Sequence, residues 1–270
     1  MGVLDGKVAI VTGAGRLRGI GRATALALAD LGVDLVITGT GRDPEKYPPD
    51  EKAVGWRDIE STAQQVRDRG RRCAPLVADV VKSADAQQTV AAALKEFGRI
   101  DFLINNSAFA RGPDRVPLLE LSEDLWQKVL QIKLTGSFLM SKAVLPTLVQ
   151  QGQGGAIINV SSIAGKRGMQ NAVAYCTSNF GIQGFTQALA MECAPHNIRV
   201  NAVCPGIIDT SRMDDLGRAE TWTTVIKQMV PLNRPGSDEE IGKFIAYLCT
   251  PDASYITGQS LNIDGGVVMW

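Results

Sequence analysis

Four glycines near the N-terminus form the first group whose spacing points to chemistry: Gly13, Gly15, Gly19 and Gly21. Glycine allows positive φ angles and lets the backbone come close to a bound group. An apolar run precedes this segment and a helical pattern begins at Arg22, so helix amides and the helix dipole would point at the loop. The segment therefore predicts a pyrophosphate site. The strict GxGxxG fingerprint fails, because Arg18 stands where its last glycine would be.

Short β-branched runs alternate with helical patterns along the whole chain. Continuous apolar strands separated by helices are typical of a buried parallel sheet, and right-handed crossovers place helices on both of its faces. The expected strands are 8–11, 35–37, 76–78, 102–104, 156–160 and 199–203, and the expected helices are 23–31, 62–69, 86–97, 125–149 and 172–194. We predict an α/β protein: one domain, residues 1–270, with a Rossmann-type doubly wound parallel sheet in three α/β/α layers.

Two long connections interrupt this pattern. Residues 41–56 are rich in Pro, Gly and charge and indicate an inserted loop, which either covers the adenosine end of a cofactor or is a solvated insertion without a role. Residues 207–230 are a candidate substrate lid. Five apolar side chains could line a substrate pocket or belong to the core: Phe109, Met169, Met213, Leu216 and Trp222.

Composition narrows the class of partner. The 28 Lys and Arg balance 28 Asp and Glu, so no overall field draws the chain to nucleic acid or to anionic lipid. The N-terminus lacks a signal-peptide pattern, and no long uncharged apolar stretch predicts a membrane span. Five scattered cysteines predict reduced thiols rather than a metal site, and His196 after Pro195 indicates a capping or surface role. We expect a cytoplasmic protein with a small-molecule partner, no nucleic acid, no membrane and no metal.

Motifs in order along the chain resemble the classical short-chain dehydrogenase/reductase family. The glycine segment is similar to the family's TGxxxGxG signature, although five residues rather than three separate Gly13 from Gly19. The others are Asp79-Val80, Asn105-Asn106-Ser107-Ala108, Ser161-Ser162, Pro205-Gly206 with Thr210, and Asp264-Gly265-Gly266. The resemblance covers essentially the whole chain. It implies an NAD(P)-dependent oxidoreductase that transfers a hydride between a nicotinamide cofactor and an alcohol or carbonyl substrate.

The resemblance also implies where the cofactor lies. Asp79 and Val80 would flank the adenine, Asn105 would support the adenosine side, and Ile208 with Thr210 would hold the carboxamide. The other expected contacts are Gly13, Gly15, Arg16, Arg18, Gly19, Ile20, Gly21, Thr40, Arg42, Ser107, Ala108, Pro205 and Gly206.

The end of the second strand discriminates between the two dinucleotides, because an acidic residue there hydrogen-bonds the ribose hydroxyls of NAD. Gly39 stands at that position. Gly39 carries no carboxylate that would repel a 2′-phosphate. Four nearby side chains could bind that phosphate by charge-assisted hydrogen bonds: Thr40, Arg42, Arg16 and Arg18. We therefore favour NADP. NAD remains possible because Asp43 is close.

Carbonyl reduction needs an acid beside the nicotinamide, and a tyrosine held near a cation can serve. Tyr175 is the candidate, and Ser162 precedes it by the thirteen residues that the family uses. Ser162 would donate a hydrogen bond to the substrate oxygen. The family expects a lysine four residues after the tyrosine and an asparagine in the preceding long helix. Here those positions hold Asn179 and Lys133, so two members of the catalytic tetrad are exchanged.

Two outcomes are compatible with this exchange. Because the family's asparagine and lysine communicate through a water in one site, Lys133 could deliver an ammonium near the place of the missing lysine. Otherwise Tyr175 lacks its cation, and the protein is an inactive or regulatory subunit. The family associates through its two long helices, here 125–149 and 172–194, and its C-terminal segment. This predicts a homotetramer or a mixed oligomer with a related subunit.

Overall fold

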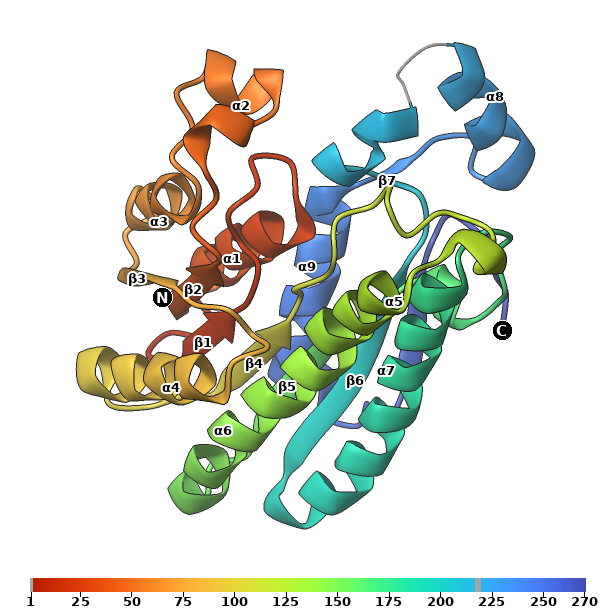
Figure 1. Ribbon diagram of the computed structural model, residues 1–270. Helices are drawn as coiled ribbons and strands as arrows, with labels where there is room; N and C mark the ends of the chain where they lie inside the picture. Colours follow the sequence, from red (N-terminus) through yellow and green to blue (C-terminus); the bar gives the residue numbers. More distant parts are fainter. Residues whose placement is uncertain (1, 217–219) are drawn as a thin grey trace.

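A parallel sheet of seven strands forms the centre of the molecule. The computed structural model describes residues 2–216 and 220–270 (Figure 1). All strand pairs in this sheet are parallel. Across the sheet the order is β3 (Cys73–Val77), β2 (Asp34–Gly39), β1 (Val8–Val11), β4 (Phe102–Asn105), β5 (Gly155–Val160), β6 (Ile198–Pro205) and β9 (Ser260–Ile263). The order reverses between β1 and β4, so the carboxyl ends of these strands flank a crevice of the kind that binds ligands in open α/β sheets.

Helices cover both faces of the sheet. On one face lie α1 (Ile20–Asp30), α3 (Ile59–Arg67) and α9 (Asp238–Cys249), whose apolar side chains share a buried cluster with alternate residues of the strands. On the other face lie α4 (Ser83–Phe97), α6 (Gly136–Gln151) and α7 (Val173–Cys193), which form the second cluster (Figure 1). The predicted doubly wound three-layer fold is confirmed.

The expected elements are present with shifted ends, and several others were not predicted. The sequence did not predict β9, a strand of four half-buried residues at the sheet edge. It also did not predict α9, although Ser237 and Glu240 form a capping box at its start. The candidate lid contains β7 (Ile208–Asp209), a 3₁₀ segment (Ser211–Leu216) and α8 (Glu220–Met229), while its residues 217–219 lie outside the described residues. The short strand β7 pairs with β8 (Gly236–Ser237).

The helix expected at 125–149 is one continuous helical run of three parts. It begins with α5 (Glu123–Leu130), passes through a π-helical turn (Gln131–Thr135) and continues as α6. The run is long and apolar enough to cross a membrane by those two measures. Its inward residues Met140, Val144 and Leu148 are buried against the sheet, as in the core helix of an α/β fold.

The inserted loop and the lengthened glycine segment form one structural unit. Residues 41–56 contain a 3₁₀ turn (Pro44–Lys46) and α2 (Pro49–Ala53). Glu51 of α2 is wholly buried, and one of its carboxylate oxygens accepts a hydrogen bond from the Leu17 amide at 3.0 Å. The Arg42 guanidinium and the Trp56 indole both donate to the Gly15 carbonyl, at 2.8 and 2.7 Å. The insertion therefore supports the glycine segment.

Candidate active site

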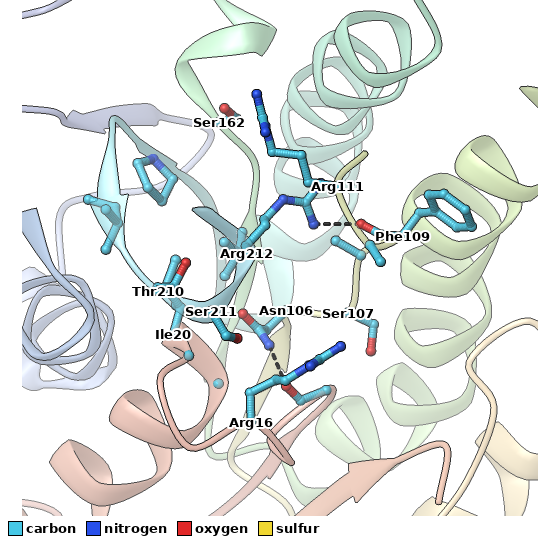
Figure 2. Close-up of a pocket in the computed structure, with 18 of the residues that line it drawn as sticks. Arg16, Ile20, Asn106, Ser107, Phe109, Arg111, Ser162, Thr210, Ser211 and Arg212 are labelled. Carbon is cyan, nitrogen blue, oxygen red and sulfur yellow. Dashed lines mark hydrogen bonds between the residues drawn. The ribbon is translucent and has the colours of Figure 1, made fainter. Parts of the chain in front are cut away.

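A cavity of about 750 Å³ lies at the carboxyl ends of the parallel strands. The glycine segment forms one side, and the loops after β3, β4, β5 and β6 form the others (Figure 2). Residues Val225 and Met229 of α8 also contribute, so the described part of the candidate lid does face the cavity. Of the five apolar candidates, Phe109, Met169 and Met213 line it. Trp222 is not among its described lining residues, and the side chain of Leu216 lies outside what the structure describes.

The glycine segment has the close packing that its composition predicted. Gly13 has a positive φ of 68°, and a Cβ on Gly21 would lie 2.5 Å from the Asn106 amide nitrogen and 2.6 Å from the Gly13 carbonyl oxygen. Gly19 is the N-cap of α1, and its amide donates to the Asp238 carboxylate at 2.8 Å. This backbone turn directly before a helix fits a pyrophosphate, because only glycine permits such approach.

Asn106, and not Asn105, faces the cavity from the end of β4. The Asn106 side-chain amide donates to the carbonyls of Thr12 and Gly13, at 2.9 and 3.0 Å (Figure 2). Asn105 points the other way into the protein, where its amide donates to Asn159 and Ser141. Asn105, which was expected to support the adenosine side, therefore does not line the cavity, and its neighbour Asn106 does. Successive residues of a strand face opposite sides, and the sequence alone did not show which one met the cavity.

The other predicted cofactor residues all line this cavity: Gly13, Gly15, Arg16, Arg18, Gly19, Ile20, Gly21, Thr40, Arg42, Asp79, Val80, Ser107, Ala108, Pro205, Gly206, Ile208 and Thr210.

Two of the three arginines expected to meet a 2′-phosphate are already paired. Arg42 donates to Glu51 at 2.7 Å and to Asp58 at 3.0 Å. Arg18 contacts the carboxylates of Asp50, Asp209 and Asp214. Arg16 lines the cavity and forms no ion pair with a described residue.

Asp58 brings a carboxylate to the end of β2, which the sequence reasoning missed. It precedes α3 and has φ 51° and ψ −132°, a backbone conformation that costs a non-glycine residue about 1–3 kcal/mol. A Cβ on Gly15 would collide with its carboxylate, and a Cβ on Gly39 would lie 3.8 Å from it. No local pattern signals this contact, because nineteen positions separate Gly39 from Asp58 and the insertion brings them together.

Ser162 and Tyr175 line the same cavity at its other end, after β5 and in the first turn of α7. The Ser162 hydroxyl accepts a hydrogen bond from the Ala164 amide at 3.1 Å, which leaves its proton free to be donated. Two guanidinium groups lie over the Tyr175 ring. Arg115 is 3.9 Å and Arg212 is 5.1 Å from the ring centroid. Neither arginine was expected from the sequence.

Lys133 and Asn179 have different surroundings. Lys133 lies in the π-helical turn and lines the cavity, and its Nζ donates to the Val160 carbonyl at 2.7 Å. Burial, reinforced by the charge of Arg212, lowers the pKa of Lys133 from 10.5 to about 7. Asn179 is wholly buried and is not a lining residue of the cavity. Its amide donates to the Tyr175 carbonyl one helical turn earlier, at 2.8 Å, and its Oδ1 has no hydrogen-bond partner among the described residues.

Comparison with known proteins identifies the family. Residues 13–268 match the family model described as enoyl-(acyl carrier protein) reductase. A short-chain dehydrogenase/reductase of Aspergillus oryzae is 37% identical over 98% of this chain and 95% of its own. A 3-oxoacyl-[acyl-carrier-protein] reductase of Synechocystis is 37% identical over the full length of both. The chain belongs to the classical short-chain dehydrogenase/reductase family. Carveol dehydrogenase from Mycobacterium avium, solved in complex with NAD, superposes with a TM-score of 0.89 at 29% identity, over 99% of each chain.

The burial of Lys133 predicts a pH-dependent stability. The folded-state pKa near 7 lies below the unfolded value of 10.5, so the unfolded chain binds more protons between these two pH values. As the pH rises from about 7 to 10.5, the unfolding free energy of the natural protein should increase, relative to that of Lys133→Met, by up to about 1.4 kcal/mol per pH unit. Below pH 7 the difference between the two proteins should be constant. Denaturant titrations at several pH values measure this. Exposed Lys95→Met is the control, and a pH-independent difference for Lys133→Met would show a solvated ammonium.

Proposed function

We propose that this protein is an NAD(P)-dependent oxidoreductase that transfers a hydride between a nicotinamide cofactor and an alcohol or carbonyl substrate. The observation that carries this proposal is that the glycine segment, Ser162, Tyr175 and Lys133 line one cavity. The relatives named as reductases and the neighbour solved with NAD support it. The cofactor, when bound, supplies or accepts the hydride.

The residues of the chain itself then bind the substrate and move the proton. In the reductive direction the Ser162 hydroxyl donates a hydrogen bond to the substrate oxygen, and the Tyr175 hydroxyl delivers a proton to it. We propose that Lys133 replaces the lysine that other members carry at the position of Asn179. An amine with a pKa near 7 exchanges protons readily at neutral pH, so Lys133 can restore the proton that Tyr175 gives up. The alternative is a catalytically impaired subunit with a structural or regulatory role.

Four variants separate these accounts. Tyr175→Phe should lower kcat by about 10²- to 10⁴-fold, because it removes the proton donor. Lys133→Met should abolish turnover with the fold intact. The double exchange Lys133→Asn with Asn179→Lys should retain turnover or raise it, and Asn179→Lys alone should do worse, because it adds a second ammonium to this region. NAD(P)H oxidation with a panel of ketones, and the reverse reaction with alcohols, measures this beside the Lys95→Met control. Activity only in the double exchange would instead establish the impaired subunit.

The preference for NAD(H) or NADP(H) depends on side chains of opposite charge near the end of β2. The prediction of NADP(H) rests on Gly39 and the arginines, and Arg16 is the one that still supports it. We propose that Asp58 makes NAD(H) the tighter ligand, because its carboxylate lies beside Gly15 and Gly39. It would accept hydrogen bonds from the ribose hydroxyls. It would also repel a 2′-phosphate, because the one guanidinium of Arg42 is shared between the carboxylates of Asp58 and Glu51 and balances only one of them.

Calorimetric titration of both cofactors tests this preference. The natural protein should bind NAD(H) more tightly than NADP(H), and Asp58→Asn should shift the ratio of the two Kd values toward NADP(H) by about tenfold or more, as expected for a charged hydrogen bond. Asp30→Asn, which alters an exposed carboxylate paired with Arg69 away from the cavity, is the matched control. Tighter NADP(H) binding by the natural protein would restore the prediction made from the sequence, and binding of neither would refute the site.

We also propose a homotetramer, with a mixed oligomer as the alternative. The outward faces of α6 and α7 expose Phe138 and Phe180, at 45% and 48%. Met269 and Trp270 at the C-terminus are exposed as well. Apolar surface of this kind calls for a partner surface.

Light scattering on the purified protein should give four times the mass of the chain. Phe180→Asp should reduce the assembly, because it places a charge in the contact. Val54→Asp, at an exposed position of the inserted loop, should leave it unchanged. A stable monomer at micromolar concentration for the natural protein would contradict the proposal.

A further inference from the structure

Three arginines surround the reactive end of the cavity. Arg111 and Arg115 come from the loop after β4, and Arg212 comes from the 3₁₀ segment after β7. Figure 2 shows Arg111 and Arg212 extending into the same part of the cavity. Two separate segments thus place cations beside Tyr175, the proposed proton donor. A hydride transfer between neutral molecules has no need of them.

Arg212 has donors to spare. One of its terminal nitrogens donates to the Phe109 carbonyl at 2.5 Å (Figure 2), and the centre of the guanidinium lies over the Tyr175 ring. A guanidinium carries five N–H donors in a fixed planar fork. Among the side chains that the structure describes, residues 2–214 and 222–270, no carboxylate pairs with Arg212. Toward these residues its remaining donors are open to a ligand.

The charges around the cavity are divided along its length. Asp58 and Asp79 are the acidic residues among its described lining, and both belong to the adenosine end. At the reactive end Arg115 pairs with Asp114, which is wholly buried. Burial lowers the pKa of Arg115, and the nearby charges of Arg212 and Arg111 lower it further. Arg212 therefore adds a positive charge beside Tyr175 that no described side chain balances, and an anionic ligand would stabilise it.

From this arrangement we propose that the substrate is a small oxo acid or hydroxy acid whose carboxylate is bound by Arg212, assisted by Arg115. This proposal rests on the proposed function and names its substrate class. A carboxylate matches the guanidinium fork with two parallel hydrogen bonds. Since the same 750 Å³ must also receive the cofactor, the acid has to be small. In reduction the hydride passes from the reduced nicotinamide to the carbonyl carbon, and a proton from Tyr175 goes to the oxygen. The products are the hydroxy acid and the oxidised cofactor.

Matched substrates that differ only in charge test the proposal. The panel contains short 2-, 3- and 4-oxo acids, the methyl ester of each, and a phosphorylated ketone. The natural protein should reduce at least one acid with a kcat/KM about 10- to 100-fold above its ester, as expected for hydrogen bonds between charged groups. Reduction of the phosphorylated ketone alone would assign the arginines to phosphate and overturn the carboxylate.

Variants show whether Arg212 acts on the substrate or only packs on Tyr175. Arg212→Gln should raise KM for the acid about 10- to 100-fold and leave the ester within about threefold, and Arg212→Lys should restore part of the loss. Arg234→Gln, an exposed arginine paired with Glu240, is the charge-matched control. An equal fall for acid and ester in Arg212→Gln would mean that the arginine only supports the tyrosine, and would overturn the proposal.

Binding keeps this inference separate from the proposed function. Calorimetry with short carboxylates such as propanoate and butanoate, against the corresponding amides, should give binding to the cofactor-loaded protein that Arg212→Gln removes. Carboxylate binding without turnover of any compound would refute the proposed function and leave the anion site in place. Turnover of neutral ketones without carboxylate binding would leave the proposed function in place and refute the anion site.

Discussion

A wholly buried carboxylate, that of Glu51, holds the cofactor end of this molecule together. Removing a carboxylate from water costs several kcal/mol unless its oxygens are paired. The Glu51 carboxylate accepts hydrogen bonds from the Arg42 guanidinium and from the Leu17 amide. Arg42 also donates to the Asp58 carboxylate and to the Gly15 carbonyl. The glycine segment is therefore held in place by charges from a part of the chain that is distant in sequence. The position of Asp58 beside Gly15 and Gly39 depends on the same network.

The sequence was sufficient for the parts of the structure that depend on local pattern. The buried strands are continuous apolar runs, and glycines directly before a helix indicate a close-packed turn, so the fold and this turn were predictable. The spacing of Ser162 and Tyr175 that the family uses predicted one site for both, and both line one cavity. Which of Asn105 and Asn106 points its side chain into the cavity was not predictable, because the orientation of side chains at the end of β4 depends on the neighbouring loops. The arginines over Tyr175 were not predictable either, since Arg115 and Arg212 come from irregular segments whose paths have no periodic signal.

Lys133 illustrates the difference between finding a residue and knowing its state. The sequence predicted an exchange with Asn179, but it did not predict the π-helical turn, because the apolar spacing reads as one helix. Single π-helical turns inside α-helices occur frequently at functional sites. This one buries the lysine against the last carbonyl of β5, where its charge is costly. Asn179 meanwhile bonds its own helix and does not line the cavity, whereas Lys133 does.

The contacts between the inserted loop and the lengthened glycine segment also constrain the order in which evolution could have added them. An ancestor that gained α2 alone would have buried Glu51 without the Leu17 amide. One that lengthened the glycine segment alone would have left the Gly15 carbonyl without Arg42 and Trp56. The first half-step leaves the buried Glu51 carboxylate with Arg42 but without the Leu17 amide, and the second leaves the buried Gly15 carbonyl without its two side-chain donors. Each lost hydrogen bond costs about 0.5–1.5 kcal/mol, which is a noticeable fraction of a domain's stability. The two length changes are therefore expected to be inherited as a pair, and a relative that carries one should carry the other.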